Sequence, residues 1–326
     1  MMSDLRFICP DNNISKEDRK HMLIDQVSRW VDSQPLEEMV GLFGKSMPKT
    51  VSLEEKVDWL NDFAADEWDY RKKQSNGGER WTVVEDEAVL KNGDKILECV
   101  TELGLVGIEQ PICSPDYILP LGGANYSNLA RPQLARQVVD ECSLKGKSIV
   151  ALSGKRPISE AELPAIGEYA PSAKTEYDAM CTGLEKSFDL EGSDYSEKND
   201  TNENINLESS IRKYTNMYME NGIYSLAAPS SEPLKRRANS RDTFEWFLKQ
   251  FEIKPGEKLL LVTTAIYVPF QLLRFIDLAI EEGFCVDCIG VPRNGNKQNA
   301  FNQYTNYCQE TKSVINAIKS LTDQWL

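Results

Sequence analysis

Histidine is almost absent from this 326-residue chain, because His21 is the only one. It lies in a polar segment, far from any glycine-rich turn, and is expected to be a surface or capping residue. Histidine chemistry needs partner groups that orient the ring. A histidine-dependent hydrolase and a site with several histidine metal ligands are therefore not expected.

The chain also lacks long apolar runs and strongly basic blocks. No stretch approaches the ~20 apolar residues of a membrane span, and the N-terminal sequence MMSDLRFICPDNN has no signal-peptide core. We therefore expect a cytoplasmic protein with no membrane partner. The net charge of −14 argues against a nucleic acid partner. The nucleotide signatures GxGxxG and GxxxxGK[ST] are missing too, so no motif names a cofactor.

Cysteine is present but scattered, with eight residues that lie mostly in apolar segments. Cys285 and Cys288 form a CxxC pattern inside a predicted strand, where positions i and i+3 point to opposite faces. That geometry argues against a disulfide between them. We expect these cysteines to be buried thiols.

The first third of the chain predicts helices. Ser15 precedes one amphipathic segment, and Ser52 precedes a second, with Glu55 at the spacing of a capping box. Residues 85–103 predict a third helix. Because no strand alternation appears before residue 116, we expect a helical N-terminal region over residues 1–115.

From residue 116 onward, short apolar strands alternate with amphipathic helices. This rhythm indicates an α/β fold with a parallel sheet of about five strands and helices on both faces, over residues 116–326. The predicted strands are 117–121, 148–152, 222–226, 258–262 and 284–291. The predicted helices are 129–144, 176–188, 241–251, 269–282 and 302–325. The acidic, polar segment 189–209 has almost no large apolar residues, so we expect a mobile, solvated insertion there.

Small, polar or charged residues follow every predicted strand. In an open parallel sheet, ligands bind beyond the carboxyl ends of the strands. These residues are Gly122, Gly123, Asn125, Ser153, Gly154, Lys155, Ser230, Ser231, Glu232, Thr263, Thr264 and Arg293. Backbone N–H groups and hydroxyls suit phosphate or carboxylate oxygens, and Lys155, Arg237 and Arg241 add positive charge. The set predicts a small-molecule site at this edge.

The motifs LPLGGAN, LSGKRP, KTEYDAM, SSEPLKRRANSRDTFEW and LLLVTTAIYVPFQLLRF together resemble the YdcF/SanA-like family of domains, over residues 117–293. The resemblance implies a Rossmann-like fold. It also implies that the residues matching the family's motifs lie at the functional site. These residues are Gly122, Gly123, Arg131, Ser153, Gly154, Glu176, Glu232, Thr243, Glu245, Thr263 and Thr264. Tyr267 stands where the family has a histidine, and Phe270 or Gln271 where it has an arginine. S-adenosylmethionine binding is associated with one type of member.

Two main hypotheses follow. The chain is an enzyme that acts on a phosphorylated or nucleotide-like molecule, with Glu176 or Glu232 as base or metal ligand. Two carboxylates and phosphate oxygens would suit Mg²⁺. Alternatively, it binds a nucleotide or S-adenosylmethionine without catalysis, which the loss of the family histidine and arginine favours. A scaffold that presents the N-terminal helices is a third hypothesis, and the polar strand ends argue against it.

Overall fold

The computed structural model describes residues 5, 14–72, 83–107, 110–111, 114–142, 148–215, 222–292 and 303–326. The chain forms two compact units, which we call the helical unit and the sheet unit. The helical unit comprises Met1–Ile108, Ala265–Glu281 and Pro292–Leu326. The sheet unit comprises Glu109–Thr264 and Glu282–Val291.

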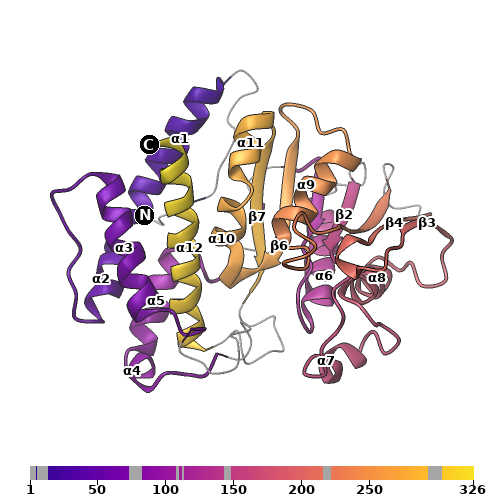
Figure 1. The fold of residues 1–326 in the computed structure, drawn as a ribbon, viewed down its shortest axis with the longest axis horizontal. Coiled ribbons are helices and arrows are strands. Elements are labelled where there is room, and N and C mark those ends of the chain that lie inside the picture. Colours follow the sequence, from indigo (N-terminus) through magenta and orange to yellow (C-terminus); the bar gives the residue numbers. More distant parts are fainter. Residues whose placement is uncertain are drawn as a thin grey trace. The chain divides into compact units, whose positions relative to one another are not determined.

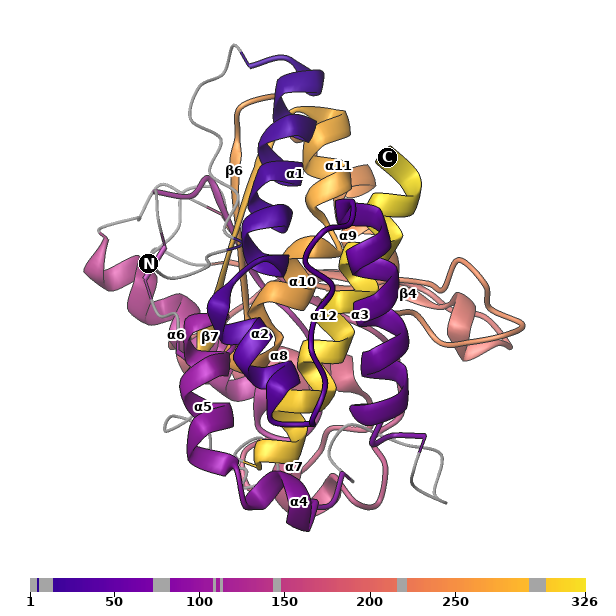
Figure 2. The same ribbon diagram turned by 90° about the vertical axis from the view of Figure 1, so that its left-hand side faces the viewer.

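The helical unit contains the predicted N-terminal helices. Its elements are α1 (Lys16–Val31), α2 (Gln34–Gly41), α3 (Leu53–Glu67), α4 (Glu87–Leu90), α5 (Gly93–Glu102), η3 (Ala265–Tyr267), α10 (Val268–Leu273), α11 (Ile276–Glu282) and α12 (Tyr304–Trp325). Helix α12 packs against α3, α4, α5 and α10, and runs beside α3 (Figure 2). The predicted caps at Ser15 and at Ser52, with its Glu55 capping box, are confirmed.

Two predicted helices are each broken into two. The segment 85–103 forms α4 and α5, and the second begins at Gly93. A side chain at Gly93 would lie 2.5 Å from the ring of Tyr304, so the close approach of α12 requires glycine there. The segment 269–282 forms α10 and α11, which belong with α12 to the helical unit rather than to the sheet. Sequence periodicity predicts which face of a helix is apolar, but it does not predict which element packs against that face.

The sheet unit carries seven strands among the described residues, in the order β3-β4-β5-β2-β1-β6-β7. Figure 1 labels β2, β3, β4, β6 and β7 of this sheet. The strands are β1 (Tyr117–Pro120), β2 (Ser148–Ser153), β3 (Tyr195–Asp200), β4 (Ser209–Tyr214), β5 (Ile223–Ala227), β6 (Lys258–Thr264) and β7 (Cys285–Val291). The helices are α6 (Ser127–Glu141), α7 (Leu163–Gly167), α8 (Glu176–Ser187), α9 (Ser240–Gln250) and the 3-10 turn η2 (Ile205–Leu207).

The prediction of about five parallel strands is therefore incomplete. Five strands, β5, β2, β1, β6 and β7, are parallel, and β3 and β4 extend the sheet in antiparallel fashion. Both extra strands are rich in polar residues. Strand β3 is largely exposed, and β4 buries only Ser210 and Tyr214, so neither shows the continuous apolar run of the parallel strands.

The acidic segment 189–209, expected to be a mobile loop, contains β3 and η2. Its side chains are held by polar contacts. Glu197 accepts hydrogen bonds from the Tyr177 hydroxyl at 2.7 Å and from Arg212 Nε at 3.1 Å. The guanidinium of Arg212 lies 4.1 Å from the centre of the exposed Tyr195 ring. The prediction counted apolar side chains alone, and so it missed backbone pairing and charged contacts.

The connections between parallel strands determine which face of the sheet each helix covers. Helix α6 packs against β1, β6 and α8, and α9 packs against β2 and β5. The chain steps from β1 to β2 in one direction and from β5 to β6 in the other, so right-handed crossovers place α6 and α9 on opposite faces. At Gly183 of α8, a side chain would lie only 1.7 Å from the Asn128 carbonyl oxygen of α6.

None of the helices in the described part of the chain combines the length and the hydropathy that a bilayer span requires.

Candidate functional site

The carboxyl ends of four parallel strands meet side by side in the sheet unit. Pro120 of β1 pairs with Val262 of β6, Leu121 bridges to Leu152, and Ser153 of β2 pairs with Ala227 of β5. We call the residues that follow these ends the strand-end rim: 121–126, 153–156, 228–239 and 263–264, with the first turn of α8. The prediction that the loops after these four strands lie along the same edge of the sheet is confirmed.

The Gly122–Gly123 turn makes room for other groups. The N–H of Gly122 donates to the Leu152 carbonyl at 2.6 Å, and that of Gly123 donates to Asn128 Oδ1 at 3.0 Å. The Asn128 amide returns a bond to the Gly123 carbonyl at 2.7 Å. Both glycine N–H groups are thus used within the protein. A side chain at Gly122 would lie 2.2 Å from Oε1 of Glu176, and one at Gly123 would lie 2.9 Å from Nη1 of Arg131.

Arg131, near the start of α6, ties two strand ends together. Its Nη1 donates to the carbonyls of Leu121 and Gly122 at 2.7 and 2.5 Å, and its Nη2 donates to Thr264 Oγ1 at 3.2 Å. The side chain is buried. Arg131 therefore holds the ends of β1 and β6 in register, and this is a positioning role.

The backbone just before α6 offers unused donors. Asn125 adopts a left-handed conformation, with φ of 54°, and its carbonyl accepts a hydrogen bond from the Tyr169 hydroxyl at 2.9 Å. The N–H groups of Ala124 and Asn125 donate to no described residue. Turns of this kind can direct successive N–H groups toward an anion, and the start of a helix favours negative charge.

Glu176 is a partly buried carboxylate of the rim. It begins α8, whose cap is the Thr175–Asp178 capping box. Its Oε2 accepts from Arg156 Nε at 3.1 Å, and its side chain is 15% exposed. Its Oε1 lies over Gly122 and accepts no hydrogen bond from the described residues. One oxygen is thus fixed by the protein and the other remains open to a ligand.

Arg156 is fixed in turn by Glu162. Its Nη1 and Nη2 donate to the two Glu162 oxygens at 2.6 and 2.7 Å. Glu162 is fully buried, and it also accepts from the Ser159 N–H and hydroxyl at 3.0 and 2.7 Å. Burial alone would raise the pKa of Glu162, but these hydrogen bonds, with that from Arg156 the largest, lower it.

Lys155 follows β2 in the loop that also carries Arg156. Its Nζ lies 4.8 Å from the centre of the Tyr177 ring, and Tyr177 adjoins Glu176 in the chain. The Tyr177 N–H donates to the Gly154 carbonyl at 3.1 Å, which holds the two loops together. No described carboxylate lies within ion-pair distance of the Lys155 ammonium. Ser153 is buried, and its hydroxyl donates to the Leu226 carbonyl at 2.9 Å.

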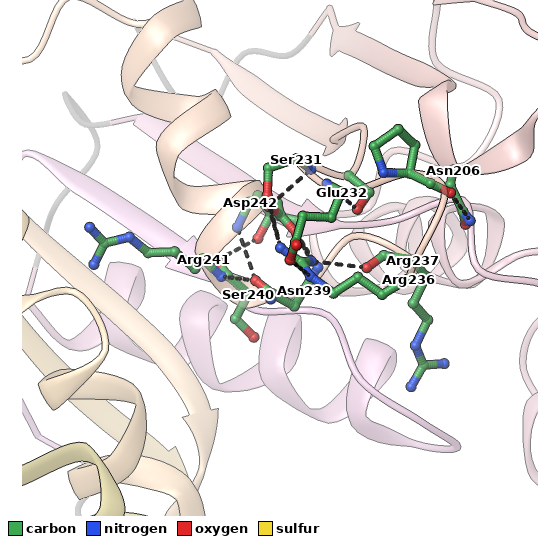
Figure 3. Close-up of polar contacts among 12 residues, drawn as sticks. Asn206, Ser231, Glu232, Arg236, Arg237, Asn239, Ser240, Arg241 and Asp242 are labelled. Atoms are coloured by element: carbon green, nitrogen blue, oxygen red, sulfur yellow. Dashed lines mark hydrogen bonds and ion pairs between the residues drawn. The ribbon is translucent and has the colours of Figure 1, made fainter. Parts of the chain in front are cut away.

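A second ion-pair cluster closes the loop after β5 (Figure 3). Arg236 binds both oxygens of Asp242, the Ser231 hydroxyl at 2.8 Å and Glu232 at 3.0 Å. Burial alone would raise the pKa of Asp242. Hydrogen bonds from Arg236, Ser231 and the Asn239 backbone outweigh burial and lower the pKa to about 2. This cluster holds the loop and the start of α9 in place.

The remaining predicted residues occupy different environments. Glu232 is 45% exposed and paired with Lys235 and Arg236, and these hydrogen bonds lower its pKa. The guanidinium groups of Arg237 and Arg241 point away from the cluster in Figure 3, and Arg241 pairs with Glu245.

All three threonines of the predicted set are buried, and Thr264 accepts the hydrogen bond from Arg131. Two other members of the set lie elsewhere. The Thr243 hydroxyl donates to the Ser240 carbonyl, and the Thr263 hydroxyl finds no described partner. Tyr267 belongs to the helical unit, and Arg293 lies outside the described residues.

Sequence reasoning missed Arg156, Glu162, Arg236 and Asp242. The first two lie in a loop without periodicity. The sequence did contain one indication of Glu162, because Ser159 and Glu162 have the spacing of a capping box. His21, in contrast, is exposed on α1 as expected, 3.8 Å from Glu17. Among the described residues, no cluster of three or more carboxylates, cysteines and histidines is arranged to hold a metal ion.

Comparisons with known proteins relate the chain to mycobacterial proteins. Residues 15–104 match the family described as the Rv3785 N-terminal domain. The uncharacterized protein Rv3785 of Mycobacterium tuberculosis and the uncharacterized protein Mb3814 of Mycobacterium bovis are each 27% identical over 347 residues, covering 98% of this chain and 95% of theirs. No solved structure matches the chain.

The resemblance to the YdcF/SanA-like family is wrong. The matching family is that of the Rv3785 N-terminal domain, and the relatives align over nearly the whole chain, helical region included. The motifs that suggested the resemblance were short. Paired glycines after a strand and hydroxyl residues at strand ends satisfy general needs of parallel sheets, so they do not identify one family. The chain is similar to the Rv3785 proteins of mycobacteria over almost its full length.

Proposed function

We propose that the chain binds a small phosphorylated or nucleotide-like molecule at the strand-end rim and acts on it as an enzyme, with Glu176 as the general base. The observation that carries this proposal is the presence of an uncompensated cation and an oriented carboxylate on neighbouring segments of the rim. Lys155 has no described carboxylate partner, and Glu176, the first residue of α8, has one oxygen without a described hydrogen-bond donor.

The rim supplies complementary groups for such a ligand. Lys155 and the unused N–H groups of Ala124 and Asn125 suit phosphate oxygens. Glu176 suits a proton acceptor, because Arg156 fixes its orientation without blocking Oε1. Within the rim, Arg156, Lys235 and Arg236 are each paired with a carboxylate. Arg131, just beyond it on α6, donates to protein carbonyls. Lys155 is therefore the basic side chain that we assign to the ligand.

The topology supports the same location. We propose that the sheet is Rossmann-like, because its parallel strands follow the order β5-β2-β1-β6-β7. From β1 the chain continues to β2 on one side, and from β6 it continues to β7 on the other side. The switch point of the sheet therefore lies between the neighbouring strands β1 and β6. Ligands of open α/β sheets bind outside the strand ends at such a switch point. Here Arg131 bridges the two strand ends beneath the Gly122–Gly123 turn.

Binding of a nucleotide or S-adenosylmethionine without catalysis is the second candidate function. It is favoured by the environment of Glu232, the other carboxylate predicted to act as a base or metal ligand. Its carboxylate is paired with Lys235 and Arg236, which lowers its pKa and makes it a poorer base. Turnover of a phosphorylated substrate with Mg²⁺ that is lost in Glu176→Gln would support the enzyme. Ligand binding with no turnover would support the binder.

The first experiment is a thermal-shift screen of ATP, AMP, S-adenosylmethionine and sugar phosphates, with and without Mg²⁺. A ligand at 100 times its dissociation constant adds about 2.7 kcal/mol of stability. We expect Lys155→Met to weaken binding about tenfold or more, because a charged hydrogen bond contributes roughly 1.5–3 kcal/mol. Lys249→Met is the matched control, since that exposed lysine lies in the last turn of α9.

Two outcomes would count against the proposal. If none of the compounds stabilises the wild-type protein, the rim does not bind this class of molecule. If Lys155→Met and Lys249→Met bind a stabilising compound equally well, the ligand lies elsewhere.

A further inference from the structure

The open oxygen of Glu176 restricts the chemistry of the ligand. A carboxylate accepts hydrogen bonds and donates none. Its Oε2 is occupied by Arg156, and its Oε1 stands over the space left by Gly122 with no described donor. Whatever contacts Oε1 must therefore offer a hydrogen-bond donor. A phosphate oxygen or a carboxylate would be repelled there.

The orientation of this acceptor is fixed by two layers of contacts. Both terminal nitrogens of Arg156 are committed to the buried Glu162, so only Nε faces Glu176. Glu162 is itself held by the Ser159 N–H and hydroxyl. The guanidinium cannot turn to a new partner without leaving Glu162 unpaired in the interior, which is costly. Glu176 thus presents a preorganised acceptor rather than a mobile side chain.

The charges around Glu176 distinguish between two kinds of donor. Arg156 Nε lies 3.1 Å from its carboxylate, and the Lys155 ammonium lies over the ring of the next residue, Tyr177. A ligand ammonium at Oε1 would lie close to the Arg156 guanidinium, which already occupies the other oxygen of the same carboxylate. A hydroxyl group carries no charge, so it can occupy the position without that repulsion.

Resting on the proposed function, we infer that the ligand carries sugar hydroxyl groups as well as a phosphate, and that Glu176 accepts hydrogen bonds from those hydroxyls. Lys155 and the N–H groups of Ala124 and Asn125 bind the phosphate of the same molecule. Arg156 and Glu162 act through Glu176, and they are positioning residues. Phosphorylated sugars and ribonucleotides fit this description, whereas inorganic phosphate and phosphorylated acids without hydroxyls do not.

The test compares phosphate probes with and without sugar hydroxyl groups. Isothermal titration calorimetry measures the affinities of AMP and 2′,3′-dideoxy-AMP, and of ribose 5-phosphate and inorganic phosphate, for the full chain. We expect the wild-type protein to bind the hydroxyl-bearing member of each pair roughly ten- to hundredfold more tightly. In Glu176→Ala this preference should fall to about one, while the dideoxy probe keeps its wild-type affinity.

Control variants separate the inference from general damage. Glu160→Ala removes an exposed carboxylate from the same loop as Glu162 and should keep the full preference. Glu162→Gln should reduce the preference severalfold without changing the affinity for dideoxy-AMP, because it loosens Arg156 but leaves Lys155 in place. A cooperative urea transition in each variant shows that it is folded before denaturant is added.

The outcomes distinguish the two proposals. Equal binding within both pairs would overturn the role of Glu176 and leave the phosphate site standing. A preference for the hydroxyl-bearing probes that survives in Glu176→Ala would also overturn it. Failure of all four probes to bind would overturn this inference together with the proposed function.

Discussion

Replacement of Gly183 with alanine should force helices α6 and α8 apart and destabilise the sheet unit. Gly183 lies in the middle of α8, where the backbone of α6 comes closest. An added Cβ would lie 1.7 Å from the Asn128 carbonyl oxygen and 2.8 Å from its carbonyl carbon. Both are backbone atoms, so no side-chain rotation relieves the contact.

The size of the effect follows from these distances. Ordinary van der Waals contact begins near 3.4 Å, so the two backbones must separate by roughly 1.7 Å at this point. Overpacking typically costs about 1–3 kcal/mol, and a rigid backbone contact belongs at the upper end. The better helix propensity of alanine offsets about 1 kcal/mol. We expect a net loss of about 2 kcal/mol or more in the free energy of unfolding.

Urea unfolding followed by circular dichroism measures this loss as a lower midpoint at an unchanged m-value. Gly167→Ala and Gly41→Ala are matched controls, because an added Cβ meets nothing within 4 Å at either position. We expect both to stay within about 0.5 kcal/mol of the wild-type protein. A midpoint for Gly183→Ala equal to those of the controls would refute the reasoning. Movement of α6 and α8 should also weaken ligand binding, since their first turns carry Asn128 and Glu176.

Two further substitutions test the rim. Gly122→Ala places a Cβ 2.2 Å from Glu176 Oε1, so it should displace that carboxylate and remove the hydroxyl preference in calorimetry; retention of the preference would contradict the geometry. Asp242→Asn should destabilise the protein by about 2 kcal/mol at pH 7, because the pKa of Asp242 falls from 3.8 to about 2 on folding. A lowered pKa stabilises the protein above pH ~4, and the contribution disappears as the pH falls toward ~2. The urea midpoints of the wild type and the variant should therefore converge at low pH, and a constant difference would count against the ion pair with Arg236.

Local patterns predicted much of the fold. The five parallel strands and the helices between them follow from short apolar runs and amphipathic periodicity, and the caps at Ser15 and Ser52 follow from residue types at fixed spacing. These features depend on near neighbours in the chain. Strand β3 escaped prediction because its side chains are polar and largely exposed, so that backbone pairing with β4 and polar contacts such as that of Glu197 with Arg212 define it.

The sequence placed polar residues at every strand end, but it did not separate those with internal partners from those without. Arg131, predicted to bind a ligand, donates hydrogen bonds to backbone carbonyls and to Thr264. Lys155, in contrast, has no described carboxylate partner. No role was predicted for Glu162 from the sequence, yet its carboxylate fixes the position of Arg156. Short motifs also misled the family comparison, because glycine turns and hydroxyl residues recur wherever parallel strands end.

By itself, the sequence determined where strands and helices form and that their polar ends share one edge, since periodicity and strand alternation are local properties of the chain. Only the tertiary structure decided which charges neutralise one another. Arg156 meets Glu162 and Glu176, and Arg236 meets Asp242, because loops of irregular conformation bring them within hydrogen-bond distance. The path of such a loop through space is set by packing against distant segments, so residue spacing does not reveal it.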